Sequence, residues 1–128
     1  MKSLSSKPAP KISQAELDVM DVLWTQSPLA ASDVAERLSE KSWNIRTVKT
    51  LLSRLVEKEV VDTEQDGRRY LYTPLVSKKD YARGAVQKLS NRLFGGRAAP
   101  LVAHLAETKG LSEQDISELE ALIREFKS

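Results

Sequence analysis

The change in hydrophobic period after residue 58 is the feature that most restricts how this chain can fold. Up to that point, apolar residues recur every three or four positions, as they do along one face of a helix. Beyond it, residues 60–63 and 69–73 form short runs rich in β-branched and aromatic residues, with Asp66 and Gly67 between them. An Asp-Gly pair favours a hairpin because glycine readily adopts the positive φ angle of a tight turn. We therefore expect three helices followed by a β-hairpin.

Two short helices are expected before residue 44. In the first, Ser13 and Glu16 have the spacing of a capping box, and Pro28 stops the helix because proline disfavours helical geometry in the preceding residue. Ser32 is placed to cap the second helix, after a short apolar link. The apolar faces of these helices are predicted to consist of Leu17, Met20, Leu23 and Trp24 in the first and Val34, Ala35 and Leu38 in the second.

The third helix, expected from about residue 45 to 58 after an Asn44 cap, has two different sides. At about 100° per residue, its apolar and polar positions separate onto opposite faces. The apolar stripe is Val48, Leu51, Leu52, Leu55 and Val56, and the polar face is Arg46, Lys49, Thr50, Ser53 and Arg54, with Thr47 at its edge. Three helices followed by a hairpin match a winged helix-turn-helix. We thus predict a mainly α fold with a small β-hairpin wing and a C-terminal helical dimerisation region.

The basic residues are concentrated around this third helix. Residues 41–58 contain five basic side chains and one acidic one, whereas residues 12–40 contain six acidic and one basic. A polar helix face alone is as often merely solvated, but the second helix of a helix-turn-helix points its N-terminal residues at base edges in the major groove. We therefore expect this face to contact DNA.

Individual roles follow from the side-chain chemistry. We expect Arg46, Thr47 and Thr50 to contact bases, because these side chains can hydrogen-bond base edges or touch a thymine methyl. Lys49 and Arg54 are expected to contact phosphates, and the basic hairpin tip to reach the adjacent backbone or minor groove. The full predicted set is Arg46, Thr47, Lys49, Thr50, Arg54, Arg68, Arg69 and Lys11. Tyr70 and Tyr72 share one strand face and are expected to pack on the helices, and Trp24 and Trp43 are expected to be structural.

The helical period returns after residue 77, with Ser77 and Ser112 as caps and glycines at 95, 96 and 110 as breaks. Helices this short cannot enclose a core by themselves, so we expect them to bury their apolar stripes in a homodimer. The predicted dimerisation residues are Val86, Leu89, Leu93, Ile116, Leu119, Ile123 and Phe126. The expected organisation is a flexible basic arm at 1–11, a winged helix-turn-helix at 12–76 and a helical dimerisation domain at 77–128.

Composition excludes many other functions. The chain has no cysteine and a single histidine, which argues against disulfides, thiol chemistry and most metal sites. His104 is expected to be an ordinary surface residue. No nucleophile–base set or phosphate-binding glycine loop is present, so we expect neither an enzyme nor a cofactor. There is no signal-peptide pattern and no apolar run near the about 20 residues that span a bilayer, which predicts a cytoplasmic protein without membrane insertion.

Residues 12–126 resemble the BlaI/MecI family of penicillinase repressors, which includes the CopY-type copper repressors. The segments that carry the resemblance are 12–20 with Trp24, Trp43 with 46–55, 91–96, and 111–116 with Glu118 and Leu119. The resemblance implies a dimeric winged-helix repressor that binds inverted repeats related to TACA/TGTA. It further implies control of a β-lactamase gene or a neighbouring membrane metallopeptidase gene, with a membrane-bound metalloprotease sensor as a possible partner.

The chain departs from the family pattern in two places. The CopY-type members carry a C-terminal cysteine cluster, and the absence of cysteine excludes that branch. In the penicillinase repressors the inactivating cut lies between an asparagine and a phenylalanine, and the aligned pair here is His104 and Leu105.

Because a fold does not determine a function, a winged-helix module that binds only proteins stays open as the alternative.

Overall fold

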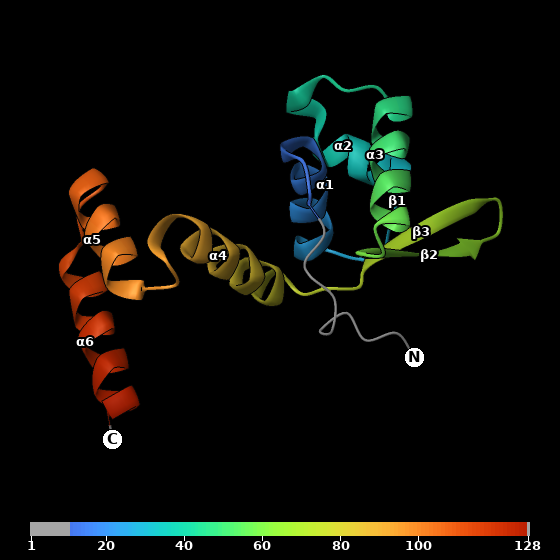
Figure 1. Ribbon diagram of the computed structural model, residues 1–128. Coiled ribbons are helices and arrows are strands. Elements are labelled where there is room, and N and C mark those ends of the chain that lie inside the picture. Colours follow the sequence, from blue (N-terminus) through green and yellow to red (C-terminus); the bar gives the residue numbers. More distant parts are fainter. Residues whose placement is uncertain (1–10, 128) are drawn as a thin grey trace. The chain divides into compact units, whose positions relative to one another are not determined.

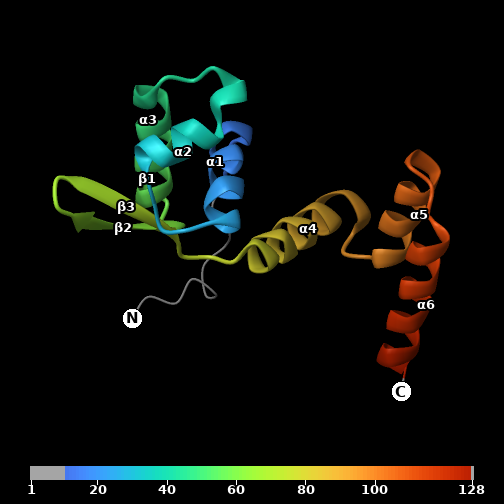
Figure 2. The ribbon, with the colours of Figure 1, turned by 180° about the vertical axis from the view of Figure 1, so that it is seen from behind.

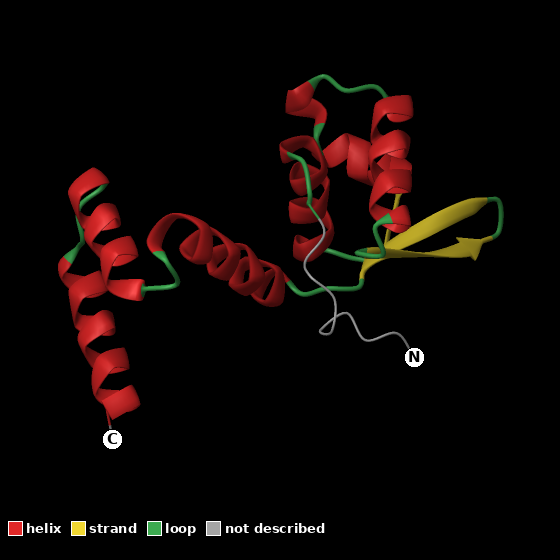
Figure 3. Cartoon of the chain, viewed as in Figure 1, coloured by secondary structure: helices red, strands yellow, loops and turns green. Residues whose placement is uncertain are grey.

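A computed structural model describes residues 11–127. Within them the chain is mostly helical with a small antiparallel sheet (Figures 1 and 3), which confirms the predicted fold class. The chain divides into two compact units, the first ending at Ala85 and the second beginning at Val86. Apart from Lys11, the predicted N-terminal arm lies outside the described residues.

The first unit consists of three helices and a three-stranded sheet. Its elements are α1 (Gln14–Thr25), β1 (Leu29–Ala30), α2 (Ala31–Arg37), a 3-10 turn (Ser39–Lys41), α3 (Ile45–Glu57), β2 (Val61–Asp66) and β3 (Arg69–Pro74). The three helices pack against one another, and α2 and α3 form the helix-turn-helix. Ser42 ends the connecting turn in a left-handed conformation with φ 59°. The hairpin of β2 and β3 extends beyond α3 in both views (Figures 1 and 2).

Two local predictions before α3 are wrong. The apolar link at residues 29–31 contains a short strand, β1, which pairs with β3 and extends the hairpin to a sheet ordered β1-β3-β2. Ser32 does not cap α2, because that helix begins one residue before it, at Ala31. Instead, the Asp33 carboxylate accepts a 3.3 Å hydrogen bond from the backbone N–H of Ala30, the N-cap residue.

The other predicted caps are confirmed. Ser13 Oγ accepts from the Glu16 N–H at 3.1 Å, and Glu16 Oε1 accepts from the Ser13 N–H at 2.8 Å. Asn44 Oδ1 accepts from the Thr47 N–H at 2.9 Å and so fixes the start of α3. In the C-terminal region, the hydroxyls of Ser77 and Ser112 each accept a backbone hydrogen bond at 3.0 Å.

The core lies between the three helices and the sheet. On α1 the buried face is rotated from the predicted one, because Glu16 and Val19 are buried whereas Leu17 and Trp24 are only half-buried. Trp24 is structural as expected, since its indole N–H donates to the Val76 carbonyl at 2.9 Å. The buried apolar residues are Val19, Met20, Leu23, Leu29, Ala30, Ala31, Val34, Leu38, Val48, Leu51, Leu52, Leu55, Val60 and Val61.

Glu16 is the reason that the buried face of α1 could not be read from hydrophobicity alone. Its carboxylate is 2% exposed and forms a 2.5 Å ion pair with Lys58, the C-cap residue of α3. Lys58 Nζ also donates to the Lys11 carbonyl at 2.7 Å. Burial by itself would raise the pKa of Glu16, but the hydrogen bonds from Lys58 and Ser13 and the Lys58 charge outweigh burial and lower it. One cation thus joins the start of α1 to the end of α3.

The wing has two chemically different faces. Gly67 takes φ +66° in the two-residue turn with Arg68, and residues 61–66 pair with 69–74. Because side chains alternate along a strand, Thr63 and Gln65 share a face with Tyr70 and Tyr72. The opposite face carries Asp62, Glu64 and Asp66.

The second unit lacks an extensive buried core. It contains most of α4 (Lys78–Phe94) together with α5 (Ala98–Thr108) and α6 (Glu113–Lys127). Among the described residues of this unit only Ser90 is buried, and many large apolar side chains are exposed. None of the described helices is both long and apolar enough to cross a membrane.

Replacing Glu16 with glutamine is expected to lower the free energy of unfolding by about 1–3 kcal/mol at pH 7, because Lys58 loses its charged partner. Folding lowers the pKa of Glu16, so its contribution is complete above the ordinary value of 4.5 and is lost as the pH falls through the lower folded value. The difference between native protein and variant should therefore shrink below pH 4.5. Urea unfolding between pH 3 and 7 measures it.

The matched control is Asp80→Asn, which removes an exposed carboxylate 3.9 Å from Arg83. An exposed pair contributes little, so this variant should change the unfolding free energy by less than about 0.5 kcal/mol. Equal losses in the two variants would contradict a special role for the Glu16–Lys58 pair.

Candidate nucleic-acid interface

The two sides of α3 separate as the sequence predicts. Val48, Leu52 and Leu55 are completely buried, while Arg46 and Lys49 are exposed. Val56, predicted as part of the buried stripe, is only half-buried and lies at the edge facing the wing. The cap Asn44 and the first three residues of α3, Ile45, Arg46 and Thr47, are all exposed, so the start of the helix is open to solvent.

The cations on the outer face of α3 have no ion-pair partner within residues 11–127. This holds for Arg46, Lys49 and Arg54, all of which are exposed. The neighbouring lysines differ, since Lys41 is 3.6 Å from Asp18 and Lys58 is bound to Glu16. The outward face of α3 therefore carries three exposed cations and no internal ion pair.

The two threonines on this face are exposed but not equivalent. Thr50 Oγ1 donates to the Arg46 carbonyl at 3.0 Å, so its hydroxyl proton is used within the helix. What it offers outward is a methyl group and an acceptor oxygen. Thr47 has its backbone N–H bound by Asn44, but its side chain makes no hydrogen bond with another described residue.

The structure separates the two arginines that the sequence places together at the hairpin tip. Arg68 lies in the turn and is exposed. Arg69 Nε lies 3.5 Å from Asp66 Oδ2, on the acidic face of the wing, which partly neutralises its charge. Lys11 is exposed, and its backbone carbonyl is held by Lys58.

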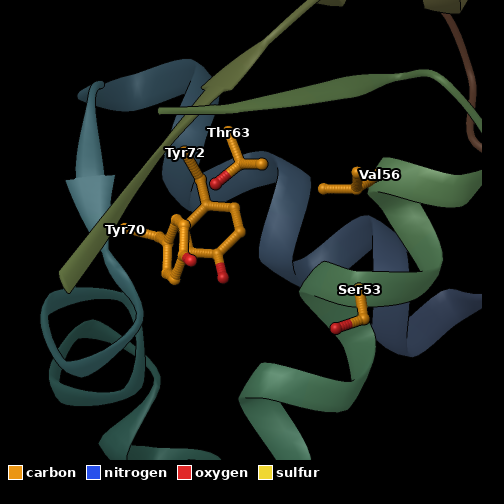
Figure 4. Close-up of a pocket in the computed structure, with 5 residues that line it drawn as sticks. All are labelled: Ser53, Val56, Thr63, Tyr70 and Tyr72. Carbon is orange, nitrogen blue, oxygen red and sulfur yellow. The ribbon is translucent and has the colours of Figure 1, made fainter. Parts of the chain in front are cut away.

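A shallow pocket of about 220 Å³ lies between α3 and the wing (Figure 4). Ser53 and Val56 of α3 line one side, and Thr63, Tyr70 and Tyr72 of the hairpin line the other. Burial, together with the nearby Tyr70, raises the pKa of the Tyr72 phenol. Tyr72 packs against the core as expected, but Tyr70 is 50% exposed, so the prediction that both tyrosines pack on the helices is wrong for Tyr70.

The pair aligned with the family's cleavage site lies inside a helix. His104 and Leu105 are in the second half of α5, and both are exposed. The His104 ring is 6.2 Å from that of Phe94. No group of three or more potential metal ligands occurs among residues 11–127.

The predicted dimerisation residues are accessible in the single chain. Leu119 is half-buried, and the other members of the set are exposed, with Phe126 at 85%. Leu105 and Leu122 are also exposed and extend the apolar surface beyond the predicted set. In the first unit, by contrast, the exposed large apolar residues are Ile45, Tyr70 and Leu75.

The model of the penicillinase repressor family matches residues 12–125. The chain belongs to this family. The penicillinase repressor of Bacillus licheniformis is 34% identical over 123 residues, which are 95% of this chain and 96% of the relative. The methicillin resistance regulatory protein MecI of Staphylococcus aureus is 29% identical over 88% of this chain and 93% of its own length.

A solved structure of a family member matches the first part of the chain. The solution structure of the DNA-binding domain of the repressor BlaI superposes with a TM-score of 0.52 and 38% identity, covering 59% of this chain and 93% of the domain. The penicillinase repressor family match confirms the sequence resemblance and the winged-helix architecture. Both units fall within the family match, since it extends into α6.

Proposed function

We propose that this penicillinase repressor family member is a DNA-binding transcriptional repressor that acts as a homodimer on an inverted-repeat operator. The observation that carries the proposal is the set of cations on α3, exposed and without internal ion-pair partners, in the second helix of a helix-turn-helix. The similarity to the BlaI domain, which is described as DNA-binding, supports it.

In this proposal α3 enters the major groove. Arg46, in its first turn, donates to a guanine edge, and the methyl groups of Thr47 and Thr50 contact thymine. Lys49 and Arg54 contact phosphates, and Arg68 reaches the backbone from the wing. Lys11 is assigned to phosphate contact at the edge of the same surface. Arg69 contributes less than Arg68, because Asp66 already compensates its charge.

Dimerisation is assigned to residues 77–128, and DNA binding to residues 12–76. The exposed apolar stripes of α4 and α6 include Leu89 at 47%, Leu93 at 61% and Ile123 at 55% exposed. Exposed large apolar side chains in this number are typical of a surface that binds another protein. A two-fold dimer presents two α3 helices, so the operator should be an inverted repeat, related to TACA/TGTA, with half-sites about one helical turn apart.

The genes we propose as targets are a β-lactamase gene or a gene for a membrane metallopeptidase, as in the named relatives' family. We further propose release by proteolysis near residues 101–105, with a membrane-bound metalloprotease as the sensor. A cut there separates the winged domain from α6, and converts a bivalent binder into two monovalent ones. Because the bond lies within α5, the helix must open locally before a protease can act on it.

Substitutions on α3 and the wing should have two distinguishable effects. Arg46→Ala is expected to weaken operator binding by about 1–3 kcal/mol and to relax the preference at one base pair per half-site. Lys49→Ala and Arg68→Ala should weaken binding to operator and scrambled DNA alike, with a salt slope shallower by about one per lost phosphate contact. Titrations at several salt concentrations separate the effects. Unchanged discrimination by Arg46→Ala would remove Arg46 from base reading, and salt-independent binding by the native protein would favour the protein-binding alternative.

The dimer is tested by Ile123→Asp, which places a carboxylate in the apolar stripe of α6. Because Ile123 is exposed in the single chain, the substitution should leave the helix intact while adding a desolvation penalty of several kcal/mol to association. Analytical ultracentrifugation should show a monomer, and operator affinity should fall sharply. Ser117→Asp adds the same charge elsewhere on α6 and should remain dimeric. A native protein that is monomeric when bound to the complete operator would contradict the assignment.

Release by proteolysis predicts a change in the size of the repressor in cells. After treatment with a cell-wall-active β-lactam, immunoblots should show a fragment of about the length of residues 1–104 as target expression rises. The role of the His104–Leu105 bond is better tested with His104→Lys than with Leu105→Pro, because a proline inside α5 would break the helix. Full derepression with the chain intact would rule out the proteolytic mechanism.

A further inference from the structure

The pocket between α3 and the wing gathers hydroxyl groups from two separate segments of the chain. Ser53 projects from α3, and Thr63, Tyr70 and Tyr72 project from the same face of the hairpin. In Figure 4 the phenolic oxygens of both tyrosines and the Ser53 hydroxyl point into the space between the strands and the helix. Ser53 and Tyr72 are 19 positions apart in the sequence. Their side chains line the same pocket because the wing folds back towards α3.

None of these hydroxyls has a hydrogen-bond partner among residues 11–127. Other exposed hydroxyls nearby are used internally, as Thr50 shows by donating to the Arg46 carbonyl. Like any tyrosine phenol, Tyr72 is protonated and therefore a donor throughout the neutral range. The rest of the lining is apolar and consists of Val56 and the tyrosine rings.

The carboxylates of the wing lie on the face opposite the pocket, and no charged side chain lines the pocket itself. Arg54 is adjacent to Ser53 in the sequence, and Arg68 lies in the turn two residues before Tyr70. The opposite face of the hairpin carries three carboxylates, from Asp62, Glu64 and Asp66. A polyanion approaching the wing is therefore repelled from one face and meets donors on the other.

We propose that this pocket binds one phosphodiester of the DNA backbone, with the hydroxyls of Ser53 and Tyr70 donating to its oxygens and the deoxyribose packing on the tyrosine rings and Val56. The inference rests on the proposed function, because it assumes that α3 lies in the major groove. Serine and tyrosine hydroxyls are common phosphate ligands in protein–DNA complexes. The apolar lining suits a sugar better than a free inorganic anion. Ser53 and Tyr70 thereby become DNA-binding residues that position α3 against the backbone.

The test uses the difference between neutral and cationic contacts, because only a cationic side chain releases counterions from the DNA when it binds a phosphate. Tyr70→Phe and Ser53→Ala should each lower affinity about 3- to 10-fold on operator and on scrambled duplex alike. The slope of log affinity against log salt should stay that of the native protein, whereas Arg68→Ala makes it shallower. Tyr81→Phe is the matched control, since Tyr81 contacts Trp24 rather than the pocket, and it should bind as the native protein does.

The possible failures are distinguishable. If the native protein binds DNA with a steep salt slope but Tyr70→Phe and Ser53→Ala bind equally well, the pocket is not a phosphate site and the proposed function stands. A loss confined to operator DNA would also overturn the inference, because it would indicate base reading. If the native protein shows no salt-dependent DNA binding, the proposed function itself fails. Thermal unfolding of each variant confirms that the removed hydroxyl has not altered the fold.

Discussion

Val48, Leu52 and Leu55 are completely buried, and their burial fixes the rotation of α3 about its own axis. A shift of one position would turn the helix by about 100° and force Lys49 into the core without a partner. The same packing that stabilises the first unit therefore places Arg46 and Lys49 in solvent. The proposed interface is the outer side of α3, and the buried apolar residues on the inner side fix which side of the helix faces solvent.

The Glu16–Lys58 pair supports this arrangement at the end of α3, where the chain turns into the wing. It joins the capping box of α1 to the C-cap of α3, with Val60 and Val61 buried immediately beyond. The wing and α3 therefore share one packed core. A shared core keeps the two elements in fixed positions, so the pocket between them keeps its shape. The second unit has no comparable core, and we propose that its exposed apolar side chains are covered by association of two copies.

The features predicted correctly from sequence are those encoded by neighbouring residues. The capping box at Ser13, the Asn44 cap and the Asp66-Gly67 turn each depend on a few adjacent positions. Two of the errors involve distant partners: β1 forms because β3 is beside it, and Glu16 is buried because Lys58 neutralises it across 42 positions. The wrong Ser32 cap is a local error, because Asp33 rather than Ser32 bonds the start of α2. The α3–wing pocket was likewise not predictable, since Ser53 and Tyr70 show nothing unusual until the hairpin brings them together.

The most direct test of the account is a titration of the isotope-labelled protein with a duplex that carries one TACA half-site, followed by amide chemical shifts in NMR spectra. The account predicts that the largest changes occur at residues 44–54 and at the wing residues 63–72, in one contiguous surface. The amides of α6 should change little on a half-site, because that helix is assigned to dimerisation. Changes centred on α6, with α3 unaffected, would contradict the central claim.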